Sequence, residues 1–328
     1  DPVGGAIDHD PITGQPTGIL KDTAMELMFR LFQEPSLDEA TAAIKAAMPH
    51  AHRAGLVGVH TMEGASAFRA FQALWASGEL KLRVTMQIPE ENLDAAIQAG
   101  LRSGFGNEWL RIGGVKIFSD GALGARTAYM LEPYEGFPGD YGLPMGTVEH
   151  LRQVIIKASR AGIASFVHAI GDRANREVLD AIGIARKDES ADDTTRTTQH
   201  ALRHRIEHAQ ITHPADIPRF ASLGVIASMQ PIHATQDMRI ADRLWGVRSA
   251  HSYAWRSLLD AGAVLAFGSD APVETLNVMA GIHAAVTRRR PDGAPGPAGW
   301  YGAQRLTVDE AVYAYTMGAA FASGEETL

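Results

Sequence analysis

From residue 36 onward, short apolar runs rich in β-branched residues alternate with longer segments of helical pattern. The first helical segment, residues 36–55, begins with Ser36 and carries Glu39 three positions later, a capping pair, and it ends at Gly55. Apolar strands that alternate with helices predict a parallel sheet with helices on both faces. Seven strands are predicted, at residues 56–62, 82–88, 110–118, 163–170, 204–209, 225–230 and 263–269.

Polar side chains fall at the carboxyl end of nearly every predicted strand. In a (β/α)8 barrel these ends converge on one face, where the sites of that fold are built, whereas an open sheet would spread them along a line. We therefore predict an α/β protein with a (β/α)8 TIM-type barrel that lacks strand 1, in one domain covering residues 1–328. The strand ends carry His60, Gln87, Lys116, His168, His208, Gln230 and Asp270.

Composition narrows the classes of partner and site. Lys and Arg total 30 against 38 Asp and Glu, a formal charge of -8, and no basic run extends beyond Arg288–Arg290, which argues against nucleic acid as a partner. There is no cysteine, so a metal must be held by His, Asp, Glu or a modified lysine. No apolar run approaches a membrane span of roughly 18 residues, and no leader opens the chain. We predict a cytoplasmic location, a small-molecule substrate and no membrane partner, and a homodimer stays open.

Both ends of the chain look incomplete. Residues 1–18 are rich in glycine and proline, which predicts a loop, and no initiator Met precedes them. The chain is therefore expected to be a fragment. Two further segments, residues 120–147 and 287–305, are rich in Gly and Pro and predict lids over the site face.

The segment His204-Arg205-Ile206-Glu207-His208 matches the H-x-x-E-H pattern of helical zinc sites. On a helix, His204 and His208 would share one face and could bind one metal, whereas on a strand they would lie well over 10 Å apart at about 3.3 Å per residue. Pro214 predicts that a new helix starts just after this segment, and a polar stretch precedes it. The segment is therefore predicted to be a strand with His208 at its end, and a helical zinc protease is the weaker alternative.

Four strand-end residues could supply metal chemistry: Lys116, His168, His208 and Asp270. A lysine inside a barrel needs either a carboxylate partner, such as Asp120 or Asp270, or carboxylation by carbon dioxide, which would make it an anionic ligand bridging two metals. A single strand-end histidine is more often a hydrogen-bonded structural residue than a ligand. Together, however, the four residues form a suitable ligand set for zinc or a similar divalent ion. Asp270 could cap the next segment or accept the proton from metal-activated water.

Five further residues are predicted to bind substrate. Asp120 and Arg126 flank a glycine-rich turn, although a salt bridge within the loop is the alternative for both. Gln230 has amide donors suited to a substrate carbonyl. His60 and His233 could line the same pocket or be satisfied polar residues of the fold.

Several longer stretches resemble the metal-dependent amidohydrolase superfamily, in particular its YtcJ-like branch, to which N-substituted formamide deformylase belongs. They are "GVKIFSDGALGART", "VHAIGDRANREVLDA", "HRIEHAQITHPADIPRFASLGVIASMQP", "YAWRSLLDAGAVLAFGSDAPVE" and "LTVDEAVYAYTMGAAFASG", and the similarity covers nearly the whole chain. By this resemblance Lys116 corresponds to the strand-four lysine, His168 and His208 to the histidines of strands five and six, and Asp270 to the strand-eight aspartate. The family implies one or two zinc or other divalent ions.

The chain also departs from the family pattern. Members carry an H-x-H pair at the end of strand one, but His50 and His52 lie in the helix before residue 56 and cannot take that part. The C-terminal segment that completes a small β-sandwich in the family is absent as well. The resemblance implies a hydrolase that cleaves an amide-type C–N bond, such as that of an N-substituted formamide, with Asp270 and His208 as catalytic residues. The alternative is a truncated or non-catalytic barrel that binds small molecules without turnover.

Overall fold

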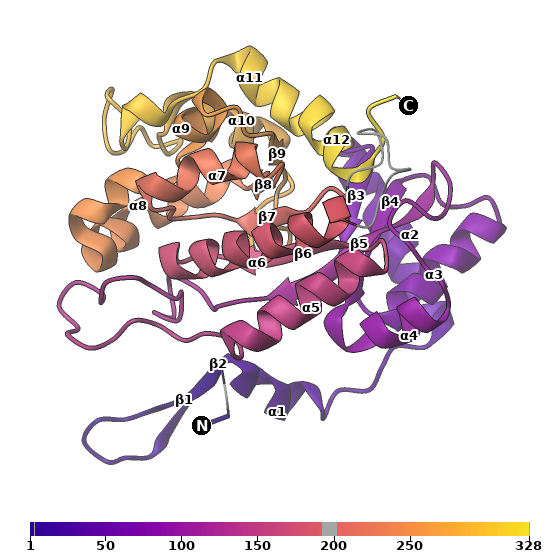
Figure 1. Cartoon of the computed structure of the whole chain (residues 1–328), viewed down its shortest axis with the longest axis horizontal. Coiled ribbons are helices and arrows are strands. Elements are labelled where there is room, and N and C mark those ends of the chain that lie inside the picture. Colours follow the sequence, from indigo (N-terminus) through magenta and orange to yellow (C-terminus); the bar gives the residue numbers. More distant parts are fainter. Residues whose placement is uncertain (3, 192–201, 328) are drawn as a thin grey trace.

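The computed structural model describes residues 1–2, 4–191 and 202–327, and its centre is a seven-stranded parallel sheet (Figure 1). Neighbouring strands in the sheet are also neighbours in the sequence, and each pair is parallel. All seven predicted strands are confirmed. They are β3 (Gly58–Thr61), β4 (Arg83–Pro89), β5 (Leu110–Phe118), β6 (Ala164–Ala169), β7 (Arg205–His208), β8 (Ile226–Met229) and β9 (Leu265–Phe267).

The sheet is strongly curled. Arg205 on β7 and His60 on β3 lie four strands apart, which in a flat sheet corresponds to about 19 Å at the usual strand spacing. Their side chains nevertheless meet, with 2.7 Å between Arg205 Nη1 and His60 Nδ1. The architecture is therefore that of a TIM-like half-barrel. Within the described residues the ring is open, because β3 and β9 each pair with only one strand.

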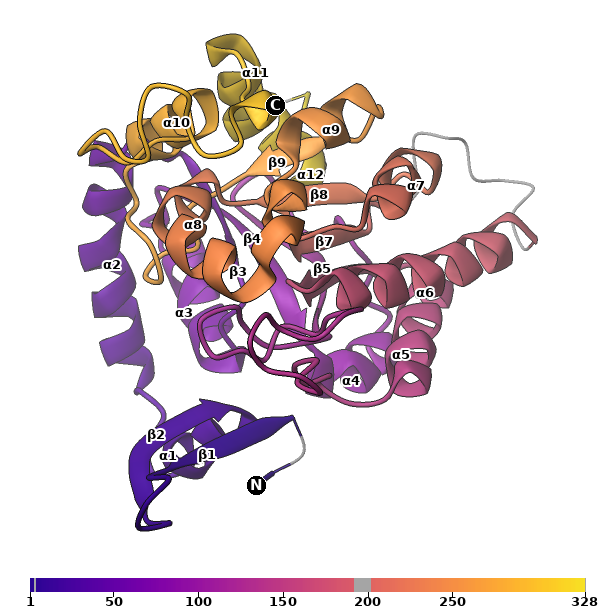
Figure 2. The same cartoon turned by 90° about the vertical axis from the view of Figure 1, so that its left-hand side faces the viewer.

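Helices connect the strands and cover the outside of the sheet (Figures 1 and 2). The expected start of the helix before β3 is confirmed, since Ser36 and Glu39 form a reciprocal capping box. Gly55, just after this helix, has a φ of +85°, which a residue with a side chain rarely adopts. The helices are α1 (Glu26–Phe29), α2 (Leu37–Arg53), α3 (Ala65–Ala76), α4 (Leu93–Gln98), α5 (Val148–Arg160), α6 (Asp172–Ala191), α7 (Ile217–Ser222), α8 (Pro231–Trp245), α9 (Trp255–Asp260), α10 (Val278–Thr287), α11 (Val308–Tyr313) and α12 (Ala319–Ser323).

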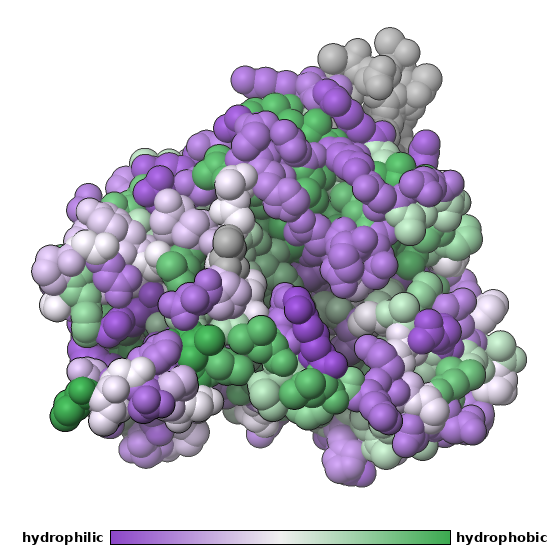
Figure 3. Space-filling view, turned by 90° about the horizontal axis from the view of Figure 1, so that it is seen from below, coloured by the Kyte–Doolittle hydropathy of each residue, from purple (hydrophilic) through white to green (hydrophobic). Residues whose placement is uncertain are grey.

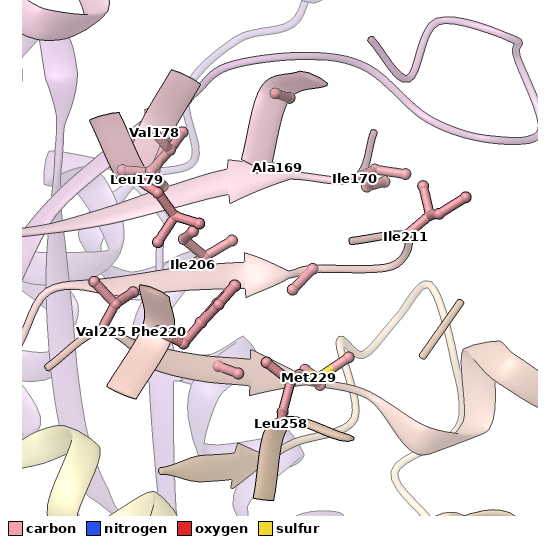
Figure 4. Packing of buried hydrophobic residues seen from close by; sticks show 14 of the residues in the cluster. Ala169, Ile170, Val178, Leu179, Ile206, Ile211, Phe220, Val225, Met229 and Leu258 are labelled. Atoms are coloured by element: carbon pink, nitrogen blue, oxygen red, sulfur yellow. The ribbon is translucent and has the colours of Figure 1, made fainter. Parts of the chain in front are cut away.

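The main core lies between the strands and the helices that cover them (Figure 4). Ile206 of β7 and Met229 of β8 are fully buried there, together with Phe220 of α7 and Leu258 of α9. Their neighbours on α6, Val178 and Leu179, are fully buried as well. Burial on both faces explains why these strands read as nearly continuous apolar runs.

The loop predicted for residues 1–18 is wrong, because most of it forms an antiparallel hairpin. Its strands are β1 (Gly5–His9) and β2 (Pro16–Asp22), with Ala6 opposite Lys21. The side chain of Asp10 accepts hydrogen bonds from the backbone N–H groups of Ile12 and Thr13, so the aspartate itself stabilises the turn. A high content of glycine and proline is therefore compatible with a hairpin here.

The hairpin and α1 lie at one edge of the molecule (Figure 2) and carry most of the exposed large hydrophobic side chains near the N-terminus. Figure 3 shows the molecule from below, and hydrophobic residues gather near the middle of the face in that view. Among the described residues, no helix has both the length and the hydropathy to cross a bilayer. The exposed hydrophobic side chains of the hairpin, of α1 and of the residues just after α1 include Ile19, Leu27, Phe29, Leu31 and Phe32.

Candidate metal centre

Three side chains from the carboxyl-end loops of the sheet converge on one point. His208 is the last residue of β7, His233 lies in the first turn of α8, and Asp270 follows β9 by three positions. One potential ligand atom from each lies within 4.8 Å of those of the other two. Two imidazoles and one carboxylate form a donor set suited to zinc or a similar divalent cation, so the residues present fit such an ion.

The backbone at two of these residues adopts an uncommon conformation. His208 has a φ of +76° and Asp270 a φ of +58°, in the left-handed region that residues with side chains seldom occupy. Ala209, next to His208, has a φ of +42° as well. Each such residue costs on the order of 1 kcal/mol and persists only where surrounding structure imposes it, a pattern concentrated at functional sites.

Hydrogen bonds orient all three side chains. His208 Nδ1 lies 2.8 Å from Gln230 Oε1, and His233 Nε2 lies 3.2 Å from Asp270 Oδ2. On its other side, His233 Nδ1 is 4.0 Å from a carboxylate oxygen of Glu274. Glu274 was not among the predicted site residues, although its place four positions after Asp270 in "SDAPVE" is a usable signal.

The surroundings keep the imidazole of His208 neutral and the carboxylate of Asp270 charged. Burial, and then the positive charge of Lys116, lower the pKa of His208 to about 4. Burial alone would raise the pKa of Asp270, but the hydrogen bond from His233 and the nearby cationic groups outweigh it and hold that pKa below its usual value. A neutral imidazole and an ionised carboxylate are the forms that bind a metal.

His168, at the end of β6, lies against this group without joining it. Its ring centroid is 4.6 Å from that of His208. Its Nε2 atom faces the backbone oxygen of Gly121 at 3.0 Å, so this nitrogen is engaged in a hydrogen bond to the loop after β5. Burial, and then the nearby His208 imidazole and the charge of Lys116, hold the pKa of His168 well below the usual range.

Lys116, on β5, is buried inside the sheet as predicted, with its ammonium nitrogen 4.7 Å from the centre of the Phe118 ring. Neither of the carboxylate partners weighed for it, Asp120 or Asp270, forms an ion pair with it in the described part of the chain. Burial lowers the pKa of Lys116 to about 8, although the charges of Glu207 and Asp270 oppose this effect. An appreciable neutral amine fraction therefore exists near pH 8.

A buried charged pair on β7, formed by Arg205 and Glu207, lies near Lys116. Arg205 Nε lies 2.6 Å from Glu207 Oε1, and the guanidinium also stacks on the ring of Phe166 at 3.8 Å. Burial and the Arg205 charge lower the pKa of His60 to about 3. His60 therefore contacts Arg205 and lies apart from the three converging side chains.

The helical zinc site considered for H-x-x-E-H is wrong, because residues 205–208 form strand β7. His204 is fully buried, and its Nδ1 accepts a hydrogen bond from the backbone N–H of Ser165 on β6. Only His208 is placed at the carboxyl end, as the strand prediction requires. The 3-10 turn Pro214–Asp216 begins shortly afterwards, where the proline predicted a new helix.

Asp120 and Arg126 do not face each other or the three converging residues. Asp120 has no exposed surface, and its carboxylate accepts hydrogen bonds from the backbone N–H groups of Tyr129, Ile170 and Gly171. Burial raises its pKa to about 7, against the effect of these three bonds. Arg126 pairs with Asp140 at 3.3 Å, so a salt bridge within the loop, the alternative weighed for it, is present.

Comparison with known proteins identifies the family of the chain. The model of the Amidohydrolase family matches residues 1–328. The chain belongs to this family. It is 33% identical to the putative amidohydrolase YtcJ of Bacillus subtilis over 98% of its own length and 59% of that protein, which places it in the YtcJ-like branch.

Other relatives of this amidohydrolase show the same pattern of coverage. It is 34% identical to Protein LONG AFTER FAR-RED 3 of Arabidopsis thaliana, over 98% of the chain and 56% of the relative. It is 26% identical to N-substituted formamide deformylase of Arthrobacter pascens, over 99% of the chain and 59% of the relative. A crystal structure of an uncharacterized metal-dependent hydrolase from Pyrococcus furiosus matches with a TM-score of 0.79 at 30% identity, covering 97% of this chain and 62% of the other. The chain thus spans less than two thirds of these proteins.

Proposed function

We propose that this amidohydrolase cleaves an amide-type C–N bond of a small molecule, with N-substituted formamides as the first substrate class to test. The observation that carries the proposal is the convergence of His208, His233 and Asp270, with potential ligand atoms within 4.8 Å of one another. The relative named N-substituted formamide deformylase supports the choice of substrate.

We further propose that the site holds zinc. His208, His233 and Asp270 would bind the ion, and His168 lies close enough to His208 to contribute after a change in its hydrogen bond to Gly121. A bound divalent cation supplies nucleophilic water at neutral pH, because it lowers the pKa of water to about 7. The predicted H-x-H strand, which would complete the family ligand set between β3 and β9, stays a prediction.

Asp270 is suited to move the proton during hydrolysis. Its pKa lies below the usual aspartate value, so the carboxylate is ionised at neutral pH and can accept a proton from the attacking water. As the C–N bond breaks, the same carboxyl group returns that proton to the leaving nitrogen, which gives a carboxylic acid and an amine. In the absence of an ion, the hydrogen bond from His233 holds this carboxylate in place.

Lys116 is suited to carboxylation. Its pKa of about 8 leaves part of the amine neutral, and a neutral amine nitrogen can bond to the carbon of carbon dioxide and release one proton. The resulting carbamate would replace a buried positive charge by an anion beside the imidazoles of the site. This change supports the predicted role of Lys116 as a bridging ligand when two metal ions bind.

The test combines elemental analysis with hydrolysis assays on protein loaded with zinc in the presence of bicarbonate. We expect wild type to retain zinc and to hydrolyse N-substituted formamides, and Lys116→Ala to lose at least one bound ion or most activity. His208→Ala should lose zinc, whereas His50→Ala, a change at an exposed histidine of α2, should not. Unchanged metal content and hydrolysis in Lys116→Ala would disprove the bridging role. Zinc binding without hydrolysis would favour the non-catalytic barrel.

A further inference from the structure

Gln230 occupies the junction between a strand and the helix that delivers His233. It follows β8 directly and precedes Pro231, the first residue of α8. Its backbone oxygen accepts a hydrogen bond from the backbone N–H of His233 at 3.1 Å, which ties the two residues into one turn. The side chain of Gln230 is buried, so its amide group has few orientations available.

The amide oxygen of this side chain contacts a histidine of the metal centre. Gln230 Oε1 lies 2.8 Å from His208 Nδ1. An amide oxygen can only accept, so His208 must carry its proton on Nδ1 and donate it to Gln230. The other ring nitrogen, Nε2, then keeps its lone pair. A neutral imidazole has one donor and one acceptor, and this contact decides which nitrogen is which.

We propose that Gln230 is a positioning residue that sets the tautomer and ring orientation of His208, so that Nε2 is the nitrogen offered to a metal ion. This inference rests on the proposed function, because the tautomer of His208 matters there only if the site binds a metal ion. The hydrogen bond between Gln230 and His208 does not depend on that function. The positioning role differs from the substrate-binding role predicted for Gln230, which uses the amide N–H groups. Both roles are compatible, because in the described part of the chain Gln230 Nε2 has no hydrogen-bond partner.

The orientation of the amide matters as much as its position. With the amide oxygen facing it, His208 Nδ1 carries the proton, and the hydrogen bond holds the ring in one orientation. If the amide were turned, its NH2 group would donate to Nδ1, and Nε2 would then carry the proton and could not bind a cation. Partners of this kind change metal affinity by about 10–100-fold in other metal sites.

Two variants and one control test the inference. Gln230→Leu removes the acceptor at similar volume, and Gln230→Glu keeps an oxygen acceptor at the same place. Gln87→Leu is the matched control, because Gln87 is also a buried glutamine near the end of a parallel strand, and its Oε1 has no hydrogen-bond partner among the described residues. Circular dichroism and urea unfolding would verify that each variant folds.

The first measurement is the nitrogen-15 NMR spectrum of histidine-labelled, metal-free protein, with the His208 signals assigned by their loss in His208→Gln. We expect wild type, Gln230→Glu and Gln87→Leu to show His208 protonated on Nδ1, and Gln230→Leu to lose this preference. A wild-type His208 protonated on Nε2 would overturn the inference. So would an unchanged tautomer in Gln230→Leu. This readout stays decisive even if Gln230→Leu folds poorly, because the wild-type result alone can contradict the proposal.

The second measurement is zinc affinity by competition with a chromophoric chelator. We expect Gln230→Leu to bind zinc about 10–100-fold more weakly than wild type, and Gln230→Glu and Gln87→Leu to stay within about fivefold. Equal affinity of Gln230→Leu and Gln87→Leu would overturn the positioning role. If no protein, wild type included, binds zinc, the proposed function fails, while the tautomer spectra still decide the role of Gln230.

Discussion

Asp120 and Asp270 both lie just past the carboxyl end of a strand, yet their surroundings differ sharply. The side chain of Asp120, after β5, is 0% exposed, whereas that of Asp270, after β9, is 33% exposed. Asp120 accepts three backbone N–H hydrogen bonds. In the described residues the carboxylate of Asp270 accepts only the bond from the His233 side chain, and the backbone of Asp270 is in the left-handed region.

The difference separates a carboxylate that holds the fold together from one that is available for chemistry. Asp120 joins the loop after β5 to the turn before α6, and it has no exposed surface through which to reach a substrate. Asp270 keeps free lone pairs beside two imidazoles, at the expense of backbone strain. Residue type and strand-end position are the same for both, so burial and the number of hydrogen bonds that each carboxylate accepts distinguish them.

The largest expected effect is on catalysis at Asp270. Asp270→Asn removes the proton acceptor, and we expect kcat/KM for an N-substituted formamide to fall by about 10²–10⁴-fold. The free energy of unfolding should change little, because asparagine tolerates the positive φ of this position and can still contact His233. Steady-state kinetics and urea unfolding measure the two quantities. Hydrolysis within tenfold of wild type would remove Asp270 from the proton-transfer role.

The next effect is on stability at Asp120. Asp120→Ala leaves three backbone N–H groups without an acceptor, and at 1 kcal/mol or more for each we expect a loss of about 3 kcal/mol in the free energy of unfolding. Asp120→Asn, which keeps one acceptor oxygen, should lose less. Urea denaturation of the metal-free proteins gives both values. A loss below about 1 kcal/mol for the alanine variant would show that water replaces the carboxylate.

The smallest expected effect is on the free energy of unfolding when a glycine near each aspartate is replaced. A Cβ atom on Gly171, whose N–H binds Asp120, would lie 2.0 Å from the backbone oxygen of Tyr129, whereas one on Gly268, two residues before Asp270, would meet nothing within 4 Å. We expect Gly171→Ala to lower the free energy of unfolding by about 2 kcal/mol and Gly268→Ala to change it by less than about 0.5 kcal/mol. Thermal and urea unfolding compare the pair. Equal losses of stability in the two variants would mean that the backbone around Gly171 and Tyr129 can shift to accept the added methyl group.

Much of the architecture was accessible from local patterns. The seven strands were predicted because apolar, β-branched runs between helical segments are a property of each segment alone, and the helix start at Ser36 was predicted from its side chain and that of Glu39. The same reasoning placed His208 at a strand end and excluded a helical zinc site. It missed the hairpin of β1 and β2, because a short side-chain turn at Asp10 is a weak signal beside a high glycine content.

The grouping of polar residues depended on the curl of the sheet and on a few backbone angles far apart in the sequence. His233 joined His208 and Asp270 because Pro231 starts α8 directly after β8, and the first turn of that helix points its third residue inward. Asp120 turned toward backbone amides that come from another strand connection, 50 positions away. Such contacts have no periodicity that a sequence can display, since they arise only when the strands pack side by side and their loops meet.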